Sequence, residues 1–280
     1  MDAPRKPFAW QPFTPRGVAA FADASLGRLL LIQLIVACLS AGAVVWFFHN
    51  AWFPVVSSAI QHLPDSGQIR AGRLDWAGAS PQTLAENRFL GFSVDLQHTG
   101  KVRSAAHLLV ECGQTDVRIY SLLGFVQEFY PHHRTIPANR LELAPWWGAW
   151  APIFLILTAG VVIAGLLLSW AVLATMYFLP TWLVAFFANR ELTLSGSWRL
   201  AGAALIPGAL VMIAGIVVYG WGALDLVQLA IVVGAHFAIG LGYVGVGTAG
   251  LPQHPDGVNL KTNPFATAEK PQAKKSATAD

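Results

Sequence analysis

The strongest constraint on this chain is an uncharged run of 40 residues, 149–188, which contains no Asp, Glu, Lys or Arg. A helix needs roughly 20 predominantly apolar residues to cross the hydrocarbon core of a bilayer. The run therefore predicts a membrane-buried segment around which the rest of the chain is arranged. Composition agrees, because only 12% of the residues are charged, against about 25% in a soluble domain.

Hydrophobic runs predict four transmembrane helices, at 29–48, about 149–177, 200–221 and 226–247. In the first run, an uncleaved anchor helix is favoured over a signal peptide with Ala41-Gly42-Ala43 as its cleavage site. The leader is long for a signal, and the apolar run continues beyond that site. Pro180 interrupts the second run, since proline lacks the amide donor. Residues 181–188 then either lie at the membrane interface or continue a kinked helix.

Residues 49–147 form the one sizeable polar domain, with eight acidic and eight basic residues. Strand patterns occur at 68–76, 89–96, 107–112 and 116–120. Turns are expected at 64–67 and 98–101, and 55–63 is expected to extend the first helix outward. The sequence thus predicts an α-helical integral membrane protein with a small, strand-rich α+β domain between its first and second transmembrane helices. The other helices form a membrane domain at 148–247.

The placement of basic residues predicts the orientation. Residues 1–28, 189–199 and the tail, 248–280, share one side of a four-span chain and carry ten Lys and Arg. The opposite flanks, 49–68 and 141–149, carry no Lys or Arg, and neither does the loop 222–225. Short basic flanks stay in the cytoplasm, so both termini are expected there and 49–147 is expected outside a bacterial inner membrane. The tail, rich in Pro, Ala, Lys and Thr, is expected to be disordered.

His236 lies near the middle of the fourth predicted span. Ionisable groups at that depth are costly and are functional candidates by default. The sequence leaves two alternatives: a proton relay or substrate contact, or a neutral imidazole hydrogen-bonded to a neighbouring helix. Gln33, in the first span, is its possible partner, and the two form a speculative intramembrane polar site. A relay is disfavoured, because no intramembrane carboxylate accompanies the histidine.

No pattern predicts a catalytic, cofactor or metal site. Residues 240–245 match GxGxxG, but they end a predicted span, so close helix packing explains the glycines better. His132 and His133 are adjacent and would point to opposite faces of a strand. Cys112 is expected to be a small buried hydrophobe and Cys38 a buried, inert thiol. The net charge of +3 implies no large nucleic-acid surface.

Two short motifs carry a resemblance. Leu63-Pro64 followed by 69–74 is similar to an "LP…I.nGkL" opening, and 197–201 with 204–207 is similar to "s..rla.ya..p" at the start of a later span. With the order of segments across 29–247, these motifs resemble a family of uncharacterised bacterial membrane proteins, a domain of unknown function with a Yip-like membrane region. The resemblance implies an accessory role, since some members are associated with sugar uptake, and it carries over no catalytic residues.

These observations favour a non-enzymatic protein of the lipid bilayer, an accessory or scaffolding component. Its exported domain would bind a partner or an envelope component, and its helices would pack against a membrane-protein partner or a second copy. The alternative is a small oligomeric transporter or permease component that uses a polar path near His236. No nucleic acid and no cofactor is expected.

Overall fold

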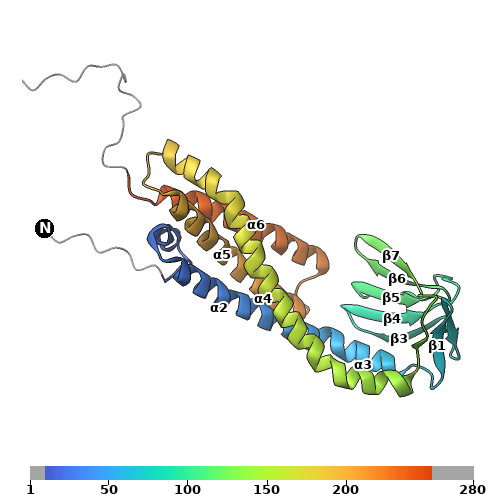
Figure 1. The fold of residues 1–280 in the computed structure, drawn as a ribbon. Coiled ribbons are helices and arrows are strands. Elements are labelled where there is room, and N and C mark those ends of the chain that lie inside the picture. The colour runs from blue at the N-terminus through green and yellow to red at the C-terminus, as the bar shows by residue number, and fades with distance from the viewer. Residues whose placement is uncertain (1–9, 254–280) are drawn as a thin grey trace, which may run out of the picture.

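The computed structural model describes residues 10–253 and has two parts, a bundle of long helices and a β domain at one end of it (Figure 1). The helices are α1 (Pro15–Ala20), α2 (Leu26–Phe47), α3 (Phe53–Gln61), α4 (Arg140–Phe187), α5 (Leu194–Gly220) and α6 (Leu226–Ala249). The strands are β1 (Gly67–Arg70), β2 (Arg73–Trp76), β3 (Gln82–Glu86), β4 (Leu90–Val94), β5 (Leu108–Cys112), β6 (Asp116–Ser121), β7 (Gly124–Phe129) and β8 (Ile136–Pro137). In the described part of the chain, four helical segments are long and apolar enough to cross a membrane. The expected combination of such helices with a strand-rich domain between the first two is confirmed.

The first long segment is continuous from Leu26 to Gln61, because a π-helical turn (Phe48–Trp52) joins α2 to α3. The expected outward extension of the first helix is therefore present. The chain before it is more than a polar leader. In α1 and the 3₁₀ turn (Phe21–Asp23), Val18 and Phe21 are fully buried against the bundle. Of the expected terminal segments, residues 1–9 and 254–280 lie outside the described chain.

Helix α4 is 48 residues long and passes through Pro145, Pro152 and Pro180 without ending. It begins earlier than the expected span, because Asn139 caps it by accepting a hydrogen bond from the Glu142 amide at 3.0 Å. It also continues beyond Pro180 to Phe187, so the region after this proline extends the helix. A proline inside a helix removes one backbone hydrogen bond, and apolar membrane helices tolerate this loss.

Helix α5 is the centre of the bundle. Leu200, Ala203, Ala204 and Ile206 are fully buried in it. Glycine lets α6 approach closely, because a Cβ atom on Gly208 would overlap the backbone carbonyl of His236. Such contacts between small residues are a common basis of helix packing in membranes.

The β domain contains a five-stranded sheet, ordered β3-β4-β5-β6-β7, and a three-stranded sheet, ordered β2-β1-β8. The pattern at 68–76 was interpreted as one strand, but it forms the β1–β2 hairpin, which turns at Ala71 and Gly72 with φ angles of 50° and 74°. The core lies between the sheets and α3, where Val94, Leu84 and Ala59 are buried. Strands β3, β7 and β8 were not expected from the sequence.

Candidate functional site

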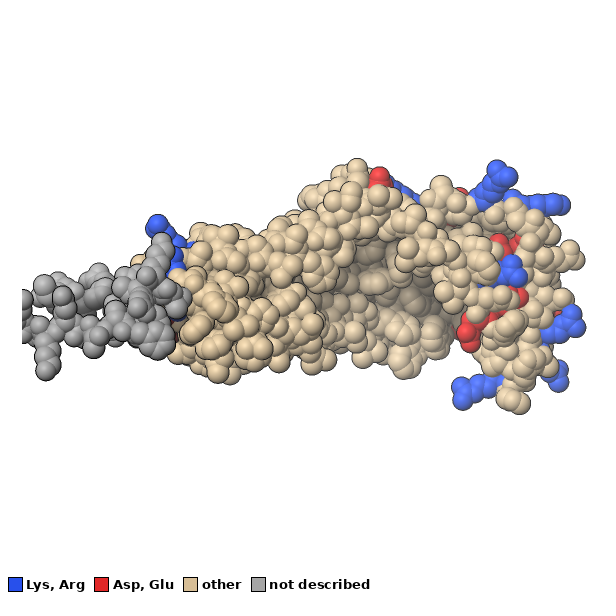
Figure 2. Space-filling model, turned by 90° about the horizontal axis from the view of Figure 1, so that it is seen from above, with Lys and Arg blue, Asp and Glu red and all other residues tan. Residues whose placement is uncertain are grey.

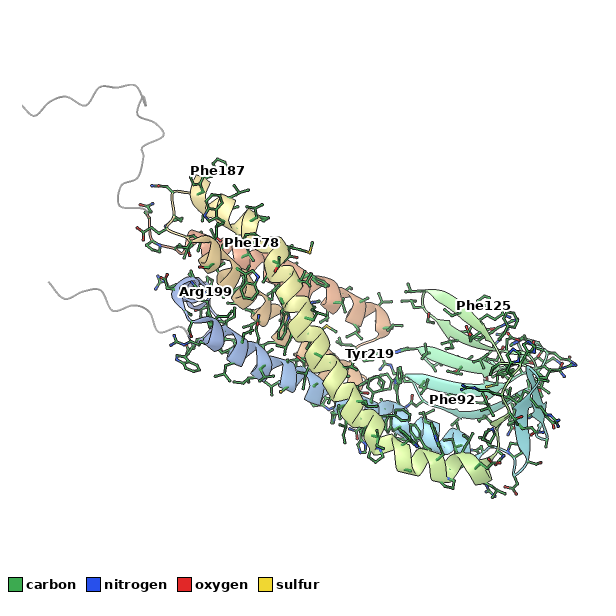
Figure 3. All side chains as sticks on the ribbon, in the orientation of Figure 1. Phe92, Phe125, Phe178, Phe187, Arg199 and Tyr219 are labelled. Atoms are coloured by element: carbon green, nitrogen blue, oxygen red, sulfur yellow. The ribbon has the colours of Figure 1, made fainter. Side chains whose placement is uncertain are left out.

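The end of α5 holds the β domain through polar contacts. The Tyr219 hydroxyl and His107 Nδ1 are 2.6 Å apart. Tyr219 lies beside the strand ends that face the helical bundle (Figure 3). Arg88 donates to the carbonyl of Leu224 at 2.9 Å and to that of Gly222. These carbonyls belong to the turn between α5 and α6, where helix ends leave acceptors without helical partners.

Aromatic rings surround the same junction. The Phe89 ring lies 5.0 Å from that of Tyr219 and 5.3 Å from that of Phe47, measured between centroids. Tyr219 also stacks on His107 at 5.6 Å. Burial lowers the pKa of His107, and the nearby Arg88 charge lowers it further. The imidazole is therefore neutral near pH 7, and its Nδ1 can accept a hydrogen bond from the Tyr219 hydroxyl.

A cluster of charged groups lies on one face of the five-stranded sheet. His98 Nδ1 is 2.6 Å from a Glu111 carboxylate oxygen, and its Nε2 is 3.1 Å from one of Asp116. Arg118 Nε lies 3.2 Å from the other oxygen of Asp116. Both carboxylates are buried, each in a residue that is only 3% exposed. Buried charges are tolerated when they are paired in this way.

The pKa values reflect this pairing. Burial alone would lower the pKa of His98, but hydrogen bonds to Glu111 and Asp116 outweigh it, and the pKa is raised. Burial alone would raise the pKa of Asp116, but the hydrogen bond from His98 and the His98 and Arg118 charges keep it below its usual value. Because both imidazole nitrogens are engaged, His98 has no free lone pair for general base catalysis. The geometry is that of a structural ion cluster.

A cleft separates the sheet from the first turn of α6. Its volume is about 750 Å³. Glu111, Tyr120 and His107 line it from the β domain, and Asp225, Leu226 and Val227 line it from the helices. This volume is within the range of small-molecule sites. The cleft adjoins the hairpin between β6 and β7, because Leu122 is also part of its wall.

The structure does not bring the two intramembrane candidates together. His236 Nδ1 lies 2.6 Å from the Val233 carbonyl of its own helix. Gln33 is 3% exposed and donates to the Gly202 carbonyl of α5 at 3.3 Å. His236 lines a separate cavity of about 630 Å³ with Tyr177 and mostly apolar side chains of α4. Each polar group thus has its own backbone partner.

The remaining candidates have structural surroundings. Burial raises the pKa of the Cys112 thiol to about 11. Cys38 was expected to be buried, and this is wrong, because it is exposed on the outer face of α2. His132 covers Gly72 in the β1–β2 turn, and His133 is exposed. Within residues 10–253, no group of three metal-ligating side chains could hold an ion.

An unpaired edge of the five-stranded sheet is the site that sequence reasoning missed. Strand β7 pairs with β6, and no strand pairs with its other side in the described chain. All six of its residues are exposed. Phe125, Val126 and Phe129 are 56%, 67% and 65% exposed, and the turn before them, Leu122-Leu123, is 61% and 97% exposed. The aromatic and β-branched residues of 124–129 were the available indication, but the expected strands ended at residue 120.

No family model, no curated protein and no solved structure matches this chain. The resemblance to a family with a Yip-like membrane region therefore stays a prediction from short motifs and segment order.

Proposed function

We propose that this chain is a non-enzymatic, multi-pass protein of the bacterial inner membrane that presents a partner-binding β domain on the outer side. Four apolar helices support the membrane assignment. In Figure 2 the surface of the helical body carries almost no charge, while Lys, Arg, Asp and Glu gather on the β domain. Arg28, Arg190 and Arg199 belong to the opposite end of the bundle, which supports placing both termini in the cytoplasm.

The β7 edge is the observation that carries the binding role. An open edge offers a row of unpaired backbone amides and carbonyls, and proteins normally protect such edges with charges, prolines or bulges. Strand β7 has one charged residue, Glu128, and no proline. It also exposes three large apolar side chains, Phe125, Val126 and Phe129. This combination is suited to the addition of an extended segment from another protein.

The edge also defines the chemistry of the partner. Side chains alternate between the two faces of a strand, so Phe125, Gln127 and Phe129 share one face, and Val126 and Glu128 share the other. A segment that pairs with β7 would place apolar residues beside the two phenylalanines. Aromatic and β-branched cross-strand pairs contribute about 0.2–1 kcal/mol each. The partner is therefore a protein with an extended, apolar segment outside the membrane.

The charged cluster supports a binding role over an enzymatic one. His98, Glu111 and Asp116 satisfy one another through hydrogen bonds. An active site instead needs a group whose proton or lone pair is free for the substrate. In this arrangement the cluster stabilises the sheet whose last strand is the open edge.

Site-specific photo-crosslinking in native membranes tests the proposal. A photoreactive amino acid at Gln127, an exposed position of β7, is expected to crosslink to a discrete partner protein. The same photoreactive residue at Ala77, an exposed position directly after β2, is the matched control. Adding Val126→Lys places a charge on the edge and should abolish the Gln127 product, whereas Ala77→Lys should not. If the photoreactive residue at position 127 gives no crosslinked product beyond that obtained at position 77, at equal protein levels, the proposed binding role is wrong.

A small oligomeric transporter is the second candidate, and one observation favours it. His236 and Tyr177 line the cavity of about 630 Å³ between the helices. A substrate path requires more polar lining than this cavity has, and Gln33 lies elsewhere. If His236 only packs, His236→Gln preserves protein level and phenotype. Loss of phenotype at a normal protein level would favour transport.

A further inference from the structure

The turn of the β6–β7 hairpin exposes two consecutive leucines. Leu123 is 97% exposed and Leu122 is 61% exposed. Turns of this kind usually contain Gly, Asn, Asp or Ser, because these residues suit the backbone geometry and the contact with water. A pair of leucines at such an exposed point of the domain favours contact with an apolar environment outside the chain. Leu122 and Leu123 together form the hairpin tip.

The hairpin tip points towards the helical bundle. Figure 1 shows β6 and β7 reaching back from the β domain to the turn between α5 and α6. In Figure 3, Phe125, the second residue of β7, lies at the bundle-facing end of that strand. Leu122 lines the same cleft as Asp225 and Val227. The tip thus lies beside the first turn of α6.

The first turn of α6 marks the outer boundary of the bilayer in the proposed topology. Asp225 is the one charged residue between 200 and 249, and an apolar helix begins directly after it. Trp46 and Trp221 meet at the same level with ring centroids 6.3 Å apart, and tryptophan is enriched at membrane interfaces. Arg103, an exposed cation, lines the cleft as well.

We propose that the hairpin tip, Leu122 and Leu123, inserts into the outer leaflet of the bilayer as a second membrane contact of the β domain. This proposal rests on the membrane topology of the proposed function, but not on the binding role of β7. The occupant is lipid, because the tip lies beside the lipid-facing start of α6, where Val227 is 54% exposed. The hairpin tip then adds a support on the side of the sheet away from α3.

Depth-dependent fluorescence quenching tests the insertion. The full chain, with Cys38 and Cys112 replaced by alanine, receives a single cysteine at Leu123, at Val161 or at Ala77. Val161 is 71% exposed on α4 within the expected span, and Ala77 is an exposed position directly after β2. Each protein is labelled with an environment-sensitive fluorophore and reconstituted into phosphatidylcholine–phosphatidylglycerol vesicles that carry nitroxide lipids, with the spin label at a shallow or a deep acyl position.

Insertion predicts a loss of Leu123-probe fluorescence that is greater with the shallow nitroxide than with the deep one. The Val161 probe should be quenched by the deep nitroxide, and the Ala77 probe by neither. A quenched Val161 probe with an unquenched Leu123 probe overturns the insertion while leaving the membrane topology intact. If the Val161 probe is also unquenched, the topology itself is wrong.

Discussion

Removing the His98 side chain should destabilise the β domain by breaking a buried ion cluster. In His98→Gln, Glu111 and Asp116 remain buried, and each loses the imidazolium that faced it. The loss of one member of a buried ion pair costs about 3–5 kcal/mol. Asp116 keeps its contacts with Arg118 and Thr115, so we expect the lower end, about 3 kcal/mol. At about 1.4 kcal/mol per factor of ten, opening of the sheet should become about a hundredfold more frequent.

Cys112 reports this opening. Its thiol is largely buried in the domain core, on the opposite face of β5 from Glu111, so a thiol reagent reaches it only when the sheet opens. The measurement is the labelling rate of the full chain carrying Cys38→Ala, with a dipyridyl disulfide that reacts over a broad pH range. His133→Gln is the matched control, since His133 is exposed. If His98→Gln and the control are labelled at the same rate, the cluster does not stabilise the sheet.

The pH dependence has a defined sign. The pKa of His98 is raised above its ordinary 6.5 in the folded chain, so its contribution is complete below pH 6.5 and is lost as pH rises through the raised value. The pKa of Asp116 is lowered from 3.8, so its contribution is complete above pH 3.8 and is lost as pH falls through the lowered value. The labelling rate of His98→Gln divided by that of His133→Gln should therefore be largest between pH 3.8 and pH 6.5. A ratio that increases above neutral pH would contradict the assignment.

Three further predictions concern the bundle and its junction with the β domain. Gly208→Leu should lower the thermal stability of the detergent-solubilised protein, because the new side chain would overlap the His236 carbonyl, whereas Gly234→Leu meets no atom within 4 Å of its Cβ and should be neutral. Arg88→Met should increase protease cleavage in the α5–α6 turn, because it removes both hydrogen bonds to that turn. The control Arg70→Met, at an exposed position of β1, should leave this cleavage unchanged. Gln33→Leu should change the free energy of unfolding by about 1 kcal/mol or less, because leucine has a similar volume and leaves no unpaired buried amide. A large loss of folded protein in a thermal assay would show that Gln33 does more than pack.

The long helices were predictable because bilayer thickness imposes a length on an apolar run, and no tertiary contact is needed to see it. Their ends were less predictable. Asn139 starts α4 through a local hydrogen bond, and Pro180 fails to end it, because the cost of one missing bond is small in a helix of this length. The position of Cys38 depends on which face of α2 meets α5. An apolar helix with no polar stripe does not encode this choice.

The sequence predicts that the β domain is rich in strands, but it does not predict which strands pair with each other. Single segments such as 116–120 carry enough alternation to be assigned, whereas the turn at Ala71 and Gly72 is marked mainly by one glycine. The charged cluster depends on contacts between residues 13 and 18 positions apart, and His98 comes from a loop. Alternation does place Asp116, Arg118 and Tyr120 on one face of β6, which is the part of this site that sequence alone could have indicated.

The position of β7 follows from how the domain is attached. Strands β3 and β4 pack against α3, and the loops before β4 and β5 meet α5 through Phe89 and His107, so support is concentrated at one side of the sheet. The sheet then extends through β5 and β6 to a strand that nothing in the described chain covers. An open apolar edge on an unsupported side of the sheet would favour non-specific association. Insertion of Leu122 and Leu123 into the bilayer would fix that unsupported side of the sheet. Strand β7 would then extend away from the membrane surface, and its partners would be restricted to segments that approach along the outer surface.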